Sequence, residues 1–352
     1  MDTSTAPPGN ETSDQIGPPA ELAPIIAKYH FFNDLIAGVL SIMINLLLIF
    51  VVTKRISSAT KVFKKVMGLT KSFEILFSVS YIITAPVFTS ISIPPDFTGL
   101  MIVNTGWQFN VKCSLVFLCL AMLLLTQQIF LSPLLYYFRY AQVCRKTGVT
   151  CIDVFLISFL NCLLHVFTSV CLCFASMPTI MDAFKLSDVA KRFTGIKSVF
   201  LLLSYTKEET TTRDRFNQII SIISAIGYAT SLIFSILVML FCTVKINMKI
   251  RESKNTSNNL LLLQKKMNRV LLTQFFCPLI FIQVPFYYSV LGPIVGLSQG
   301  LATDLLPLLF AWSPVINTLI IFILNSEIRN ALIGKQRMTA TSDARRSFAN
   351  EN

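Results

Sequence analysis

The apolar stretches of this sequence contain few side chains that could carry out acid–base chemistry. Glu74, His165 and Asp304 lie within three of these stretches, and Asp34 lies at the edge of another. Proton pumps and ion-coupled transporters usually need a chain of ionisable groups near the middle of the membrane. A single histidine at that depth is not a chain, so we expect His165 to be a hydrogen-bonded packing residue rather than a proton relay.

The sequence also lacks the patterns that accompany catalysis or cofactor binding. It contains no phosphate-binding loop, no catalytic-triad pattern, and no lysine in the last apolar stretch that could bind retinal. The chain has 9 cysteines and 2 histidines, and no cysteine pair has the C-x-x-C spacing of a structural zinc site. We therefore expect no enzyme activity, no cofactor and no metal site.

The composition is that of a protein that crosses a membrane several times. Hydrophobic residues make up 53% of the 352 residues and charged residues only 14%, against about 25% charged residues in soluble domains. The apolar residues come in long runs. The net charge of +12 could indicate nucleic-acid binding, but the basic residues lie between the apolar runs. They fit topology signals better, so we expect a lipid bilayer and no nucleic acid as partner.

Seven apolar runs are each long enough to cross a hydrocarbon core of about 30 Å. Most of the 30 lysines and arginines fall on one side of the membrane if the N-terminus is outside, which predicts a cytoplasmic C-terminus. The predicted fold is an all-α membrane protein, a seven-transmembrane-helix bundle. Its spans are Phe32–Val52, Ser72–Ile93, Cys113–Phe138, Val154–Met177, Ile219–Val244, Val270–Val290 and Leu301–Leu324.

The sequence divides into a helical domain and two polar tails. Residues 30–333 form the domain, which ends in a short amphipathic helix expected to begin at Asn325 and to lie on the membrane. Residues 1–29 are polar and proline-rich and are predicted to be an extracellular tail. This tail contains a glycosylation sequon at Asn10. Residues 334–352 are predicted to be a polar cytoplasmic tail.

The third span ends on an arginine between aromatic residues, in the order Phe138-Arg139-Tyr140. Arg139 fits an anchor that extends to the membrane surface beside an aromatic belt. It fits equally well a docking point for a cytoplasmic partner. Lys265, Lys266 and Arg269 lie on the same predicted side and would extend a basic surface there.

A candidate ligand cavity lies at the predicted outer ends of the spans. Gln283 and Tyr287 are four residues apart and share one helix face. Polar groups on an aromatic wall suit a small ligand, but they also suit interhelical hydrogen bonds and an interfacial aromatic belt. The candidate residues are Phe117, Gln283, Tyr287, Tyr288 and Asp304.

Three stretches resemble nematode serpentine chemoreceptors of the Str superfamily. They are the end of the third span through Cys144, the stretch from Leu263 to Pro285, and Ser313–Asn317 with Asn325–Ala331. The resemblance implies a G-protein-coupled chemoreceptor in the plasma membrane, at the cilia of chemosensory neurons. A small-molecule odorant or pheromone would bind among the outer helix halves, and a heterotrimeric G protein would bind at the inner face. By position, Arg139 and Tyr140 match the coupling motif.

The chain also departs from patterns of related receptors. Phe138 stands where rhodopsin-like receptors place an acid before the arginine, and Asn317-Thr318 stands where the family usually has aspartate and proline. Cys113 matches the usual disulfide position, but the segment 178–217 has no cysteine, which leaves Cys171 or Cys173 as partners. The alternatives to a receptor are a seven-helix ligand-gated channel or transporter subunit and a non-signalling partner that assists the trafficking of other receptors.

Overall fold

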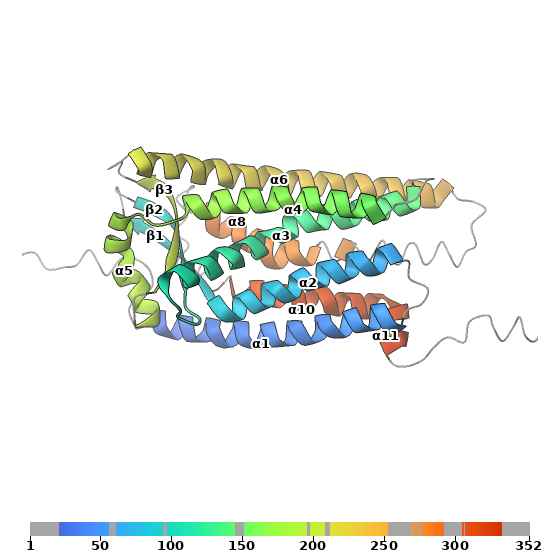
Figure 1. The fold of residues 1–352 in the computed structure, drawn as a ribbon, viewed down its shortest axis with the longest axis horizontal. Coiled ribbons are helices and arrows are strands. Elements are labelled where there is room, and N and C mark those ends of the chain that lie inside the picture. The colour runs from blue at the N-terminus through green and yellow to red at the C-terminus, as the bar shows by residue number, and fades with distance from the viewer. Residues whose placement is uncertain are drawn as a thin grey trace, which may run out of the picture.

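Long helices lie side by side in this molecule, and a three-stranded sheet and a helix cover one end of them (Figure 1). The computed structural model describes residues 21–55, 61–93, 97–144, 151–195, 198–207, 212–252, 269, 272–273, 276–291, 305 and 307–332. We call the covered end the sheet end. The opposite end is the α11 end, after the last described helix, α11 (Ser326–Leu332).

The helices of the bundle are α1 (Ala23–Phe50), α2 (Lys61–Thr84), α3 (Val111–Cys144), α4 (Cys151–Ala175), α6 (Thr212–Glu252), α8 (Val284–Leu291) and α10 (Leu308–Leu324). Four helical stretches are long and apolar enough to cross a membrane: Ala23–Lys54, Lys64–Thr84, Phe155–Ala175 and Arg215–Lys249. Three shorter apolar helices cover Val111–Gln127, Phe276–Ser289 and Leu308–Leu324. Each of these stretches overlaps one predicted span, in the same order along the chain.

The outward faces of the helices are apolar. On α4, Phe155, Leu156, Phe159 and Leu160 are all exposed. Water would solvate such a surface poorly, whereas lipid tails suit it. The bundle therefore has the exterior of a membrane protein.

The first helix begins earlier than the sequence predicted. Pro24 lies in the first turn of α1, where a missing N–H costs no helical hydrogen bond. A proline that we assigned to the tail therefore starts the helix, and residues 23–29 are helical.

The second predicted span was wrong beyond Thr84. Ala85 has a φ of 37°, and Pro86 cannot donate a backbone hydrogen bond, so the helix ends there and strand β1 (Pro86–Ile93) begins. The loop after the second strand caps the last carbonyls of α2, because the Gly106 N–H donates to the Thr84 carbonyl (2.9 Å). A Cβ at Gly106 would clash with the carbonyl of Ile83.

The sheet has apolar side chains on both faces. Strand β2 (Phe97–Asn104) pairs antiparallel with β1 and with β3 (Phe200–Lys207). Phe88, Leu100, Ile102, Leu201 and Leu203 pack toward the bundle. The alternate residues Val87, Ile91, Met101, Val103 and Leu202 pack toward helix α5 (Ile180–Thr194) and the start of α1.

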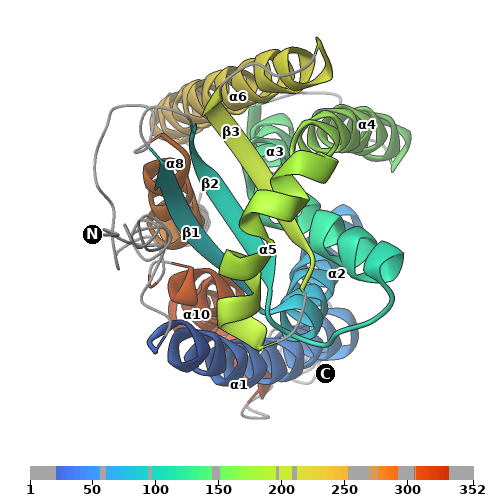
Figure 2. The same ribbon diagram turned by 90° about the vertical axis from the view of Figure 1, so that its left-hand side faces the viewer.

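Helix α5 lies across the outer face of the sheet (Figure 2). Its start is fixed by a capping box, in which Thr179 and Asp182 bond each other's backbone N–H groups. The segment 178–217, which connects two predicted spans, thus supplies a helix and a strand of a structured cover. A 15-residue helix is too short to have registered as a span.

Two π-helical turns interrupt the helices, one before α8 and one at the end of α1. A π-helical turn, η2 (Leu279–Gln283), precedes α8, where Pro285 cannot donate to the carbonyl one turn earlier. A second π turn, η1 (Val51–Arg55), ends α1. Helix α11 lies where the sequence predicted a short amphipathic helix, and its Ile328 is buried against Leu48 and Val51 of the bundle.

Candidate functional site

A buried ion pair lies inside the bundle, toward the α11 end. Lys71 and Glu74 are three residues apart on α2, and the Lys71 Nζ lies 2.8 and 2.9 Å from the two carboxylate oxygens of Glu74. The side chains are 1% and 2% exposed. Lys71 lies just before the predicted second span, which begins at Ser72, but α2 begins ten residues earlier, at Lys61, so Lys71 lies within the helix.

The ion pair is hydrogen-bonded to two other helices. Lys71 also donates to Thr318 Oγ1 (3.0 Å), and Asn317 Nδ2 donates to Glu74 Oε1 (2.6 Å). Thr318 Oγ1 in turn donates to Asn45 Oδ1 on α1 (2.7 Å). These five residues, which we call the ion-pair network, tie α1, α2 and α10 together.

Every charged atom of this network has several partners. A buried ion without its partner costs about 3–5 kcal/mol, whereas a complete pair can be close to neutral against apolar residues of equal size. The network therefore holds the three helices in one arrangement, and movement of α10 would have to break charged hydrogen bonds.

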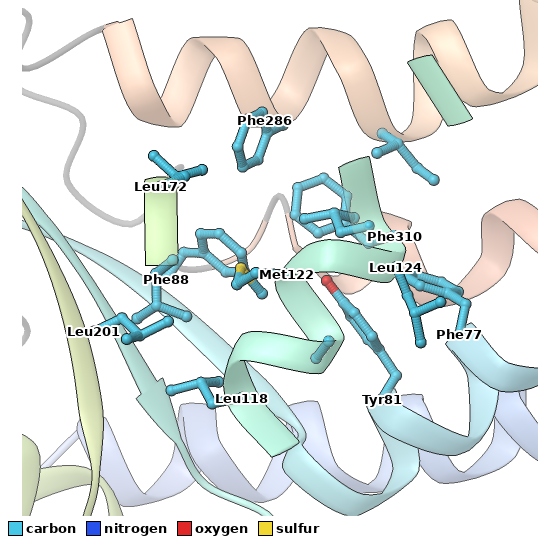
Figure 3. Packing of buried hydrophobic residues seen from close by; sticks show 14 of the residues in the cluster. Phe77, Tyr81, Phe88, Leu118, Met122, Leu124, Leu172, Leu201, Phe286 and Phe310 are labelled. Atoms are coloured by element: carbon cyan, nitrogen blue, oxygen red, sulfur yellow. The ribbon is translucent and has the colours of Figure 1, made fainter. Parts of the chain in front are cut away.

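A second site lies under the sheet, between α3, α4 and α8. The cavity there has a volume of about 10 Å³, which is room for roughly one water molecule. Figure 3 shows Met122, Leu172, Leu201 and Phe286 around this region. The full lining is Ile102, Met122, Thr126, Leu172, Cys173, Ser176, Leu201, Leu203 and Phe286.

Helices α3 and α8, which contribute lining residues, also carry buried polar groups that have no hydrogen-bond partner among the described residues. Among these groups is the side-chain amide of Gln127, of which neither the nitrogen nor the oxygen has a partner; Gln127 follows the lining residue Thr126 in the sequence. Another is the hydroxyl of Tyr287, which follows the lining residue Phe286. Buried polar groups are nearly always hydrogen-bonded. Buried groups left without a partner are the ones that a ligand could satisfy.

Other buried polar groups of α3, α4 and α6 form hydrogen bonds within the protein. His165 Nε2 lies 2.8 Å from the Leu123 carbonyl, and its ring packs on Phe130 with centroids 4.8 Å apart. Ser169 Oγ lies 2.7 Å from the Tyr228 hydroxyl. His165 is thus a hydrogen-bonded packing residue, as the sequence predicted.

The structure separates the predicted cavity residues. Gln283 is buried in the bundle, and Tyr287 packs against its central apolar cluster. Phe117 instead stacks on Phe109 near the start of α3, with centroids 5.5 Å apart. Tyr288 is 40% exposed, and Asp304 lies outside the described residues.

Arg139 lies at the α11 end of the interface between α3 and α6. Its neighbour Tyr136 is buried against Met239 and Cys242 of α6, and Tyr140 packs on Phe241 with ring centroids 6.1 Å apart. Arg139 itself is partly buried. Of the other predicted coupling residues, Arg269 is exposed, and Lys265 and Lys266 lie outside the described residues, as does the Asn10 sequon.

The cysteines considered for a disulfide are free thiols. Cys113 is exposed at the start of α3, while Cys171 and Cys173 lie on α4. The Cys173 Sγ lies 3.7 Å from the carbonyl oxygen of Cys119, not near Cys113. In the part of the chain that is described, strand pairing and apolar packing therefore stabilise the sheet and α5 at the end of the bundle, without a disulfide.

Sequence reasoning missed Lys71, Asn45, Thr318 and Gln127. The spacing of Lys71 and Glu74 was a usable signal, because residues three apart on a helix are neighbours. Gln127 is a polar residue in the middle of an apolar span, which is itself an unusual position. The links to Asn45 and Thr318 join helices far apart in the chain, and no local pattern indicates them.

Comparison with known proteins agrees with this architecture. Residues 30–333 match the family described as serpentine type 7TM GPCR chemoreceptor Str. The chain is 27% identical over 136 residues to the G-protein coupled receptor str-33 of Caenorhabditis elegans, a match that spans 38% of this chain and only 39% of that relative. Its fold is similar to the crystal structure of squid rhodopsin, with a TM-score of 0.59, 13% identity, and coverage of 94% of this chain and 90% of that one.

The family match covers most of the chain. It begins within α1, at residue 30, and includes all the later described helices of the bundle. The likeness to rhodopsin independently supports a seven-helix fold at low sequence identity. The chain therefore belongs to the Str family of serpentine seven-transmembrane G-protein-coupled chemoreceptors, and it is a multi-pass membrane protein.

Proposed function

We propose that this protein is a chemosensory receptor that binds a small-molecule odorant or pheromone under the sheet and activates a heterotrimeric G protein at the α11 end. The observation that carries the proposal is the presence of buried, unpartnered polar groups, on Gln127 and Tyr287, in α3 and α8, two of the helices that line a small apolar cavity. The family resemblance favours the ciliary membrane of chemosensory neurons as the location.

The distribution of basic residues supports one orientation in the membrane. The end of α6 that lies toward the α11 end carries Lys245 and Lys249, and Arg139 lies at the same end of α3. Lysine and arginine favour the cytoplasmic side of a membrane. The sheet end would then be extracellular, which would place Asn10 on the glycosylated side.

The site under the sheet suits a ligand that is mostly apolar and carries one or two polar atoms. Leucine, isoleucine, methionine and phenylalanine line most of the cavity, while a free amide and a free hydroxyl would fix the orientation of the ligand. The cavity is nearly filled by side chains in this structure. A ligand would therefore bind a wider conformation and shift the population toward it.

The coupling step would use the contact between α3 and α6. Tyr140 packs on Phe241, and the Lys245 ammonium lies 5.9 Å from the centre of that ring. A shift of α6 relative to α3 would uncover Arg139 and Tyr140 together. Lys265, Lys266 and Arg269 would extend the basic surface toward a G protein.

The test is ligand-dependent nucleotide exchange on co-expressed Gα subunits, with a panel of volatile and pheromone-like compounds. We expect one compound class to drive exchange, Tyr287→Phe to weaken its apparent affinity, and Arg139→Ala to abolish exchange while ligand binding persists. Tyr29→Phe and Lys191→Ala are matched controls, since both side chains are exposed at the sheet end. Ligand-evoked current in pure bilayers without a G protein would favour a channel instead.

A further inference from the structure

The sheet end of α1 carries a carboxylate inside the bundle. Asp34 is 1% exposed. Its Oδ1 accepts one hydrogen bond, from Asn33 Nδ2 at 3.0 Å. Its Oδ2 has no hydrogen-bond partner among the described residues. A carboxylate in so apolar a place needs a partner that can donate to it or carry a positive charge.

Asn33 is already engaged with α10. Its Nδ2 also donates to the Leu308 carbonyl (3.1 Å), and its Oδ1 accepts from Trp312 Nε1 (2.9 Å). These bonds fix α10 against α1 beside Asp34. Asn33 therefore cannot turn to satisfy the second oxygen of Asp34 without releasing α10.

A second unpartnered group lies next to Asp34, on α2. The two helices are in close contact, because the hydroxyls of Ser41 and Ser78 are 2.7 Å apart and a Cβ on Gly38 would collide with Ile82. By this pairing Tyr81 lies about one turn of α2 away from the level of Asp34, and the two side chains are close enough to interact electrostatically. Tyr81 is also 1% exposed, and its hydroxyl has no hydrogen-bond partner among the described residues.

We propose that Asp34 and Tyr81 form a subsite for the amine of a small hydrophobic ligand. An ammonium group would donate to Asp34 Oδ2 and to the Tyr81 hydroxyl, and it would supply the positive charge that the carboxylate lacks. The proposal rests on the proposed receptor function and adds the chemical class of the ligand.

The surroundings of Tyr81 fit the apolar part of such a ligand. Tyr81 belongs to the same apolar cluster as Phe88, Met122 and Phe310, and Figure 3 shows its hydroxyl oxygen directed toward the interior of that cluster. Phe88 and Phe310 meet edge to face at 5.5 Å. Aromatic rings near an ammonium group add a further attraction.

The experiment is a binding measurement on the full chain in lipid nanodiscs, by the shift of the thermal unfolding midpoint. The probes are straight-chain alkylamines of four to eight carbons, with the alcohols of the same length as uncharged controls. We expect the amines to raise the midpoint more than the alcohols do. Asp34→Asn should weaken amine binding roughly 10-fold or more, the effect of one charged hydrogen bond, and leave alcohol binding unchanged.

Tyr81→Phe removes one oxygen and tests the site even if Asp34→Asn fails to fold. It should weaken amine binding by a smaller factor, while the exposed Asp188→Asn and Tyr29→Phe should change nothing. Amines that bind no better than alcohols, or an amine preference that survives both Asp34→Asn and Tyr81→Phe, would overturn the proposal. Either result would leave the receptor function open, because nucleotide exchange in response to another ligand class is a separate readout.

Discussion

Helices α1, α2 and α10 bury polar side chains at two levels, one toward the α11 end and one toward the sheet end. The two levels differ in how completely their polar atoms are hydrogen-bonded. Toward the α11 end, Lys71 and Glu74 bond each other and are bonded by Asn317 and Thr318, and both charges are paired; of these residues and Asn45, Asn317 keeps its Oδ1 without a partner among the described residues. Toward the sheet end, Asp34 and Tyr81 are as deeply buried. Each keeps one polar atom without a partner among the described residues.

The difference separates a structural role from a binding role. A satisfied network stabilises one arrangement of helices, and it loses stability when any member is removed. An unsatisfied group destabilises the unliganded protein and gains a partner only when something binds. The level nearer the α11 end is therefore expected to control stability, and the level nearer the sheet end to control ligand affinity.

The largest effect is expected from breaking the ion pair. Lys71→Met leaves Glu74 buried without its cation and should lower the free energy of unfolding by about 3–5 kcal/mol. The double variant Lys71→Met/Glu74→Leu should recover most of this loss, because no charge stays unpaired. Unfolding followed by a thermal or detergent titration checks both. A double variant as unstable as the single one would show that the loss comes from packing rather than from charge.

A smaller loss is expected from Asn317→Leu. This variant removes the hydrogen bond from Asn317 Nδ2 to Glu74 and should cost about 1.5–3 kcal/mol, the range for a bond to a charged group. Ser187→Ala provides a comparison, since its hydroxyl lies outside the bundle on α5. Equal midpoints for the two variants would show that Asn317 adds nothing to the network.

A variant near the site under the sheet is expected to keep or raise the free energy of unfolding rather than lower it. Gln127→Leu replaces an amide that has no described partner by an apolar side chain of similar size, so the free energy of unfolding should stay level or rise by about 1 kcal/mol. The same variant should weaken the response to the activating ligand. A clear drop in the unfolding midpoint would mean that Gln127 is satisfied in the folded protein.

The sequence was sufficient for the seven spans, because long apolar runs leave few alternatives. It was misleading at Pro86–Ile93, where a short apolar run reads equally as a strand or as a continuing helix, and where the pairing with β2 and β3 decides. Lys71 looked like one more basic residue near a membrane surface. Only the packing of α10 against α2, which brings Thr318 to its ammonium group, shows that it is interior.

The positions of the candidate site residues depend on packing that the sequence does not show directly. Tyr287 and Gln283 were placed in the bundle because their spacing fixed a shared helix face. Phe117 and Tyr288 were chosen by their depth along the helix alone, and depth does not determine which face of a helix points inward. Asp34 was noted at the edge of a span, but its burial follows from contacts with α2 and α10 that single-sequence patterns do not contain.

One comparison tests the central claim most directly: the unfolding midpoints of Thr318→Val and Tyr287→Phe in lipid nanodiscs without ligand. Each variant removes one buried hydroxyl: the Thr318 hydroxyl is hydrogen-bonded within the ion-pair network, whereas the Tyr287 hydroxyl on α8 has no partner among the described residues. We predict that Thr318→Val lowers the midpoint and that Tyr287→Phe leaves it unchanged or raises it. A drop for Tyr287→Phe that equals or exceeds the drop for Thr318→Val would contradict the distinction between hydrogen-bonded and unpartnered buried groups.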